Sequence, residues 1–230
     1  MTPLSPMSNG AGASLSADQR NRVLRNTYWL LALSMVPTVL GAWMGIATGL
    51  ASAMSPGISL VVFLAGAFGF MFAIEKTKNS PTGVPVLLGF TFFMGLMLSR
   101  LVGQVLGLSN GSSLVMLAFA GTGSIFLGMA ALSSVIKRDL SSMGKFLFIG
   151  AIMLLVAGIA NFFIQSSALM ITLSVMAIGI FSAFILHDLK RVQDGLETNY
   201  ISATLSVYLS LYNVFQSLLA ILGLTSGRDE

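Results

Sequence analysis

Seven apolar stretches, each long enough to cross a lipid bilayer, limit what this chain can fold into. A helix needs about 20 mostly apolar residues to span a hydrocarbon core of ~30 Å. Only 9% of the residues are charged, against roughly 25% in a soluble domain. The sequence therefore predicts an all-α membrane protein with seven transmembrane helices, at residues 27–50, 56–74, 84–107, 113–136, 146–165, 168–187 and 201–224.

The basic residues indicate how these spans are oriented. Ten of the twelve Lys and Arg residues lie before the first span or in every second loop, and the alternate loops (near 51–55, 108–112 and 166–167) contain none. The positive-inside rule assigns the basic side to the cytoplasm. We therefore expect a cytoplasmic N-terminus and an external C-terminus, with the orientation set by Arg20, Arg22, Arg25, Lys76, Lys78, Lys137, Arg138, Lys145, Lys190 and Arg191.

The same pattern divides the chain into three parts. Residues 1–26 are expected to form a cytoplasmic N-terminal tail, residues 27–224 the transmembrane domain, and residues 225–230 a short external C-terminal tail. Up to Ser16 the N-terminal tail is rich in Ser, Gly, Asn and Pro, a composition typical of disorder. It has no apolar core of the kind found in signal peptides, so the first span itself is expected to direct membrane insertion.

The composition also excludes several kinds of chemistry. There is no cysteine, and the single histidine, His187, does not supply the several ligands of a zinc site. An aspartic intramembrane protease needs two close carboxylates, and Asp188 is the one acidic residue that can be counted as part of a span. We predict a protein that is not an enzyme and has no cofactor or metal. Its net charge of +4 is typical of membrane orientation rather than nucleic-acid binding.

Two features of the spans have both a structural and a functional interpretation. Gly41, Gly45 and Gly49 recur every four residues in the first span, a spacing that lets helices approach closely in lipid. It fits packing within the chain, which we favour, or a dimer face. Arg100 interrupts the third span, about 24 Å from its cytoplasmic end at 1.5 Å per residue. We expect its side chain to reach the external headgroups, with a role in a transport pathway as the alternative.

The seventh span carries a polar stripe. Ser206, Ser210, Asn213 and Ser217 follow helical spacing, so we expect this face to contact protein or a watery cavity rather than lipid. Interhelical hydrogen bonds explain the serines well and Asn213 less well.

Asp188 ends the sixth span next to His187 and lies at a depth similar to that of Ser210. It is interpreted either as an interfacial carboxylate or as a proton or cation site with Ser210 and Asn213. His187, which points about 100° away on a helix, is expected to mark the membrane interface. His187, Ser206 and Arg100 are possible accessory residues of such a site.

Three segments resemble the Bax inhibitor-1 (TMBIM) superfamily and, within it, the bacterial YccA-like branch. They are "VLRNTYWLLALSM" (23–35), "KTKNSPTG" (76–83) and "GLETNYISATLSVYLSLYNVFQSLLAILG" (195–223). The combination of "ETNYI" with "SLYN" is the most specific of these. The likeness runs from about Val23 to Leu224.

The resemblance implies six helices around a central seventh, in the cytoplasmic (inner) membrane of a bacterium. Calcium-leak members of the superfamily carry a pH-sensing pair of aspartates. Asp188 matches the first, but Ser210 stands where the second is found, and Asn213 matches a recurring asparagine. YccA-like proteins are associated with the membrane-anchored AAA protease FtsH and its prohibitin-like partners, as slow substrates that restrain it.

Two hypotheses follow for function. The first is a non-catalytic modulator of FtsH that engages the protease through its tail and through lateral helix contacts, although the tail is also interpretable as an inert leader. The second is a pH-sensitive proton or calcium leak built on Asp188, Ser210 and Asn213, which the incomplete aspartate pair disfavours.

Overall fold

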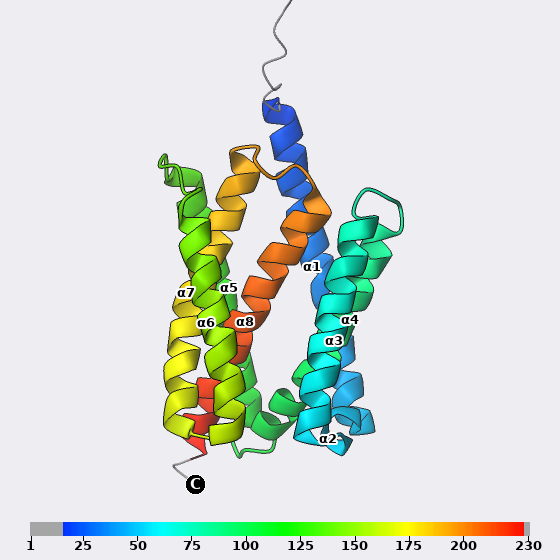
Figure 1. The fold of residues 1–230 in the computed structure, drawn as a ribbon, viewed down its shortest axis with the longest axis vertical. Helices are drawn as coiled ribbons and strands as arrows, with labels where there is room; N and C mark the ends of the chain where they lie inside the picture. Colours follow the sequence, from blue (N-terminus) through cyan, green and yellow to red (C-terminus); the bar gives the residue numbers. More distant parts are fainter. Residues whose placement is uncertain (1–15, 228–230) are drawn as a thin grey trace, which may run out of the picture.

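The computed structural model describes residues 16–227, which form helices joined by short loops and contain no strand. The helices are α1 (Ala17–Thr48), α2 (Leu50–Ala53), α3 (Pro56–Thr77), α4 (Gly83–Leu106), α5 (Gly111–Val135), α6 (Met143–Ile164), α7 (Ser167–Gln193) and α8 (Tyr200–Ser226). All except the four-residue α2 are long and apolar enough to cross a membrane, and they run roughly side by side (Figure 1). The seven predicted spans are thus confirmed.

Three helices begin at caps that the sequence makes recognisable. Ser16 starts α1 in a capping box with Gln19, and Ser55 precedes Pro56 at the start of α3. Ser166 caps α7 by accepting a hydrogen bond from the backbone N–H of Leu169. Such caps satisfy backbone donors that the first helical turn leaves without partners.

Helices α1 and α7 continue past the predicted ends of their spans at one end of the bundle. α1 begins at Ala17 and has 32 residues, about 48 Å of helix at 1.5 Å per residue, and it continues through Pro37. It projects beyond its neighbours in Figure 1. The loops 78–82, 136–142 and 194–199 lie at this same end, which we call the basic end because it carries the Lys and Arg residues described below.

Helix α8 occupies the centre of the bundle, as expected. It contacts α1, α3, α4, α5 and α7, whereas α6 packs mainly on α7; in Figure 1, α8 runs between α3 and α6. Six of its residues are at most 1% exposed: Ile201, Thr204, Val207, Tyr208, Val214 and Leu219. α4 contributes Leu87, Phe90 and Met94 to the same core.

Glycines bring α1 and α4 into backbone contact. A Cβ atom on Gly41 would collide with the carbonyl oxygen of Phe92, and one on Gly95 would collide with that of Thr38. Because these obstacles are backbone atoms, no rotamer change would relieve them. Close approach of this kind is how small residues stabilise helix pairs in lipid.

The other two glycines of the predicted stripe behave differently from each other. Gly45 is buried against the side chain of Ser99, whereas Gly49 ends α1 with a left-handed φ of 64°. Gly41 and Gly45 therefore face α4 of the same chain, and Gly49 serves the end of the helix.

Candidate functional site

His187 and Asp188 contact each other near the basic end of α7. The His187 Nδ1 atom lies 3.1 Å from Asp188 Oδ1, and the two side chains are 8% and 13% exposed. We expected His187 to point elsewhere and mark the interface; its ring is instead buried and turned toward the carboxylate. On its other side, a Cβ atom on Gly144 of α6 would lie 2.8 Å from His187 Nε2, so α6 closely covers the ring.

The polar stripe of α8 makes its hydrogen bonds within its own helix. Ser210 Oγ donates to the Ser206 carbonyl at 3.1 Å, and Asn213 Nδ2 donates to the Leu209 carbonyl at 2.8 Å. Ser210 is buried, but Ser206 is exposed. Within residues 16–227 no hydrogen bond links Asp188 to Ser210 or Asn213, and the serines of the stripe do not form the interhelical bonds that would explain them.

Two tyrosines and Thr204 supply interhelical hydrogen bonds of α8 instead; the Thr204 hydroxyl donates to the Thr27 carbonyl of α1 at 3.4 Å. The Tyr208 hydroxyl lies 2.9 Å from Thr38 Oγ1 of α1, and the Tyr212 hydroxyl donates to the Met94 carbonyl of α4 at 3.4 Å. Their sequence signal is the spacing of four residues in an apolar helix, combined with the need of a buried tyrosine hydroxyl for a partner.

The "ETNYI" motif has a structural role in this fold. Asn199 Oδ1 accepts hydrogen bonds from the backbone N–H groups of Ile201 and Ser202, which caps α8. Its Nδ2 donates to the Lys78 carbonyl and to Asn79 Oδ1, at 3.0 and 2.8 Å. One side chain therefore joins the start of α8 to the α3–α4 loop.

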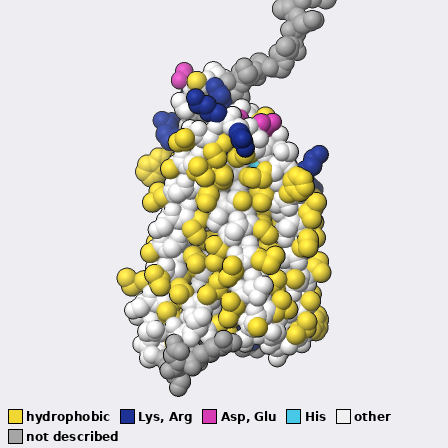
Figure 2. Space-filling model, turned by 90° about the vertical axis from the view of Figure 1, so that its left-hand side faces the viewer, with side chains coloured by type: hydrophobic (Ala, Val, Ile, Leu, Met, Phe, Trp, Pro, Cys, Tyr) yellow, Lys and Arg dark blue, Asp and Glu magenta, His cyan; other side chains and the backbone are white. Residues whose placement is uncertain are grey.

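The ten membrane-orienting basic residues all belong to the basic end. They lie in the first part of α1, at the end of α3 and just after it, in the loop 136–142, at the start of α6 and in the last turn of α7. Figure 2 shows Lys and Arg side chains gathered at this end of the visible face, above an apolar surface. Here Arg20 donates to the Gln193 carbonyl, and Gln193 donates to Ser133, which links α1, α7 and α5.

Arg100 lies at the end of the bundle opposite the basic end, six residues before the end of α4. It is partly buried, and it lines a cavity of about 550 Å³ together with residues of α3, α6 and α8. The side chain thus faces a space between helices of the same chain.

The part of the chain that the structure describes contains no group of three or more His, Cys, Asp or Glu side chains placed to hold a metal ion.

Comparison with known proteins relates almost the whole chain to one family. The family model described as "Inhibitor of apoptosis-promoting Bax1" matches residues 20–227. A relative from Escherichia coli (strain K12), named "Modulator of FtsH protease YccA", is 38% identical over 209 residues, 91% of this chain and 92% of that protein.

Two further relatives match over a similar extent. An "Uncharacterized membrane protein" of Vibrio cholerae is 38% identical over 211 residues, covering 92% of this chain and 93% of its own. A protein of Pseudomonas aeruginosa named PA2604 is 37% identical over 219 residues, covering 94% and 96%.

Proposed function

Because the chain belongs to the family described as inhibitor of apoptosis-promoting Bax1, we propose that it is a bacterial inner-membrane protein that restrains the membrane-bound AAA protease FtsH. The observation that carries this proposal is the 38% identity, over 91% of the chain, to a relative named a modulator of that protease. In this role the chain is a slowly degraded binding partner and not a catalyst. Prohibitin-like proteins remain predicted partners.

The basic end is the side proposed to face the cytoplasm and the protease. The ten orienting Lys and Arg residues at that end support this orientation through the positive-inside rule. Residues 1–15, the part of the predicted tail that lies outside the described residues, would be the segment seized; α1 begins at Ala17, after the Ser16 cap.

The packing of α1 supplies a physical reason for slow degradation. A protease that pulls on the N-terminus first loads α1, which is held against α4 by the backbone contacts at Gly41 and Gly95. The Tyr208 contact with Thr38 adds a bond between α1 and α8. Extracting α1 therefore disrupts the centre of the bundle before much chain is released.

Deletion of residues 2–15, which leaves the Ser16 cap intact, tests the tail. We expect the deleted form to be degraded more slowly by FtsH and to lose its restraint of a second FtsH substrate, both followed by pulse-chase in cells. A tail of scrambled sequence but unchanged composition is the matched control and should behave like the parent. If overproduction of the full chain leaves FtsH substrates at their normal half-lives, the proposed function is wrong; if only the deletion has no effect, the tail is not the point of engagement.

The contact between His187 and Asp188 favours a second candidate, a pH-sensitive proton or cation leak at the basic end. Both side chains are shielded from solvent and lie 3.1 Å apart, and Ser210 and Asn213 remain the predicted additional members of the site. Asp188→Asn should reduce ion flux into liposomes that contain the purified protein, with Asp194→Asn, at an exposed ion pair with Lys190, as the control. Equal flux in the parent, both variants and empty liposomes would eliminate the leak.

A further inference from the structure

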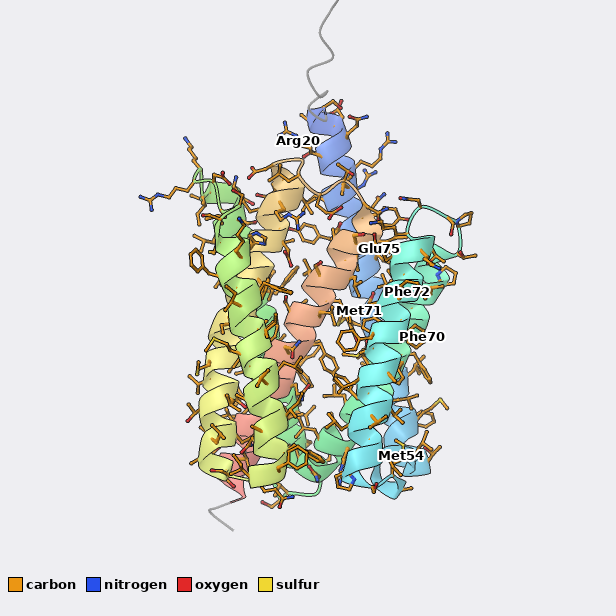
Figure 3. All side chains as sticks on the ribbon, in the orientation of Figure 1. Arg20, Met54, Phe70, Met71, Phe72 and Glu75 are labelled. Carbon is orange, nitrogen blue, oxygen red and sulfur yellow. The ribbon has the colours of Figure 1, made fainter. Side chains whose placement is uncertain are left out.

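The cavity lined by Arg100 lies at the end of the bundle opposite the basic end. Four helices contribute to it: the start of α3, the last third of α4, the end of α6 and the second half of α8. Met54, which also lines it, marks this end in Figure 3. α3 packs on α4 and α8, whereas α6 packs mainly on α7, so the cavity separates α3 from α6.

Arg100 has no carboxylate partner among residues 16–227. The six acidic residues of this range all lie toward the basic end: Asp18, Glu75, Asp139, Asp188, Asp194 and Glu197. Arg100 is six residues before the end of α4, about 9 Å along the helix axis. A partly buried guanidinium at this depth is costly without an anion, and no protein carboxylate in the described range supplies one.

Other hydrogen-bond donors line the same cavity. Asn161, only 8% exposed, uses its Oδ1 to accept from the Ser166 N–H, while its Nδ2 has no partner in the described range. The Ser59 hydroxyl is buried without a partner. Gln165 and Gln216 also line the cavity, and their side-chain amides make no hydrogen bond within the described residues. The lining thus combines one positive charge with several free donors and no carboxylate.

Gln165 ends α6 with a left-handed backbone conformation. Its φ of 55° makes it the one non-glycine residue with a positive φ between residues 16 and 227. Glycine usually occupies this position after a helix, and strained residues of this kind cluster at ligand sites. A glutamine here brings an amide to the cavity that glycine would lack.

The remaining walls are apolar. Leu60 and Phe63 come from α3, Met97 from α4 and Phe162 from α6. A small inorganic anion would leave these walls uncovered, whereas a lipid would place its acyl chains on them and its headgroup among the donors. We propose that the Arg100 cavity binds an anionic phospholipid from the leaflet at this end, with its phosphate held by Arg100 and the amides of Asn161, Gln165 and Gln216.

Native mass spectrometry of the full chain tests this site with defined lipids. The protein is released from mixed vesicles of phosphatidylglycerol and phosphatidylcholine, which share the phosphate but differ in net charge. We expect the parent to retain phosphatidylglycerol selectively and Arg100→Gln to retain it at least about tenfold less, since charge-assisted hydrogen bonds are lost. Arg138→Gln, at the basic end, is the matched control and should retain the lipid as the parent does.

Two further arms keep the test decisive. Gln165→Gly removes one donor while relieving the positive-φ strain, so it should weaken lipid retention without unfolding the protein. Excess inorganic phosphate should fail to displace the lipid; displacement would assign the site to a free anion and overturn the lipid proposal. Equal retention of the two lipids by the parent, or unchanged selectivity in Arg100→Gln, would overturn the site itself.

Discussion

Adding a single methyl group at Gly95 should destabilise the bundle. A Cβ atom there would collide with the Thr38 carbonyl oxygen, and it would lie 2.8 Å from the Thr38 carbonyl carbon and 3.0 Å from the Ala42 backbone nitrogen. Ordinary contacts begin near 3.4 Å, so α1 and α4 would have to separate by at least about 0.6 Å, judged from the carbonyl carbon alone. All three obstructing atoms belong to the backbone, so the whole helix must move.

The expected net cost of Gly95→Ala is about 2 kcal/mol. Overpacking of this kind costs roughly 1–3 kcal/mol, and the better helix propensity of alanine returns about 0.5–1 kcal/mol. Because the added Cβ collides with the carbonyl oxygen, the overpacking cost should lie near the upper end of that range. A chain of this size should then lose about 4–8 °C in Tm.

Tryptophan fluorescence during thermal unfolding in detergent is the appropriate assay. The two tryptophans of the chain, Trp29 and Trp43, both lie on α1, so the signal comes from one of the two helices being forced apart. Gly123→Ala on α5 is the matched control, because nothing lies within 4 Å of its added Cβ, and its Tm should be unchanged or slightly higher. A Gly95→Ala protein that melts at or above the parent would refute the close contact between α1 and α4.

Three other changes probe separate parts of the structure. Asn199→Ala should lower the Tm by about 4–8 °C in the same assay. The change removes a cap worth ~1 kcal/mol and the hydrogen bond to Lys78, worth another ~1 kcal/mol. Asn199→Asp keeps the acceptor of the cap and should lower the Tm by about half as much. Gln165→Gly should raise the Tm by about 2–4 °C, since relief of a left-handed conformation returns at least ~1 kcal/mol; a fall would show that the position is not strained. The backbone N–H and hydroxyl of Ser141 donate to Asp139 at 2.8 and 3.0 Å and lower the pKa of its carboxyl. This contribution to stability is therefore present above the unfolded-state pKa and lost as the pH falls through the lower folded-state pKa. Ser141→Ala should move the midpoint of Asp139 titration, followed by NMR, to higher pH, and an unmoved midpoint would contradict the cause given.

The spans were predictable because apolar length is a property of single segments. Each span can be recognised without its neighbours, and the charges between spans are likewise visible one loop at a time. The extra turns of α1 and α7 at the basic end were less visible, since charged residues such as Arg20 and Lys190 fit an exposed helix as well as a loop.

The polar stripe of α8 shows where pattern reasoning failed. Ser210 and Asn213 follow helical spacing, but each donates to the carbonyl four residues earlier in its own helix. Short polar side chains can form such a bond in any helix. Tyrosine is too long for that bond, so Tyr208 and Tyr212 reach other helices. Likewise, the setting of Arg100 depends on where α3 and α6 stand, which no single segment encodes.

The short connection between α6 and α7 has a consequence for synthesis of the chain. Only Gln165 and Ser166 separate the two helices, and the Ser166 N–H satisfies Asn161 Oδ1 on α6. α6 packs mainly on α7, and the 27 residues of α7 take roughly 1–5 s to make at 5–20 residues per second. During that interval α6 lacks its main packing partner of the folded bundle, so it must keep its place in the membrane without that contact until α7 is complete.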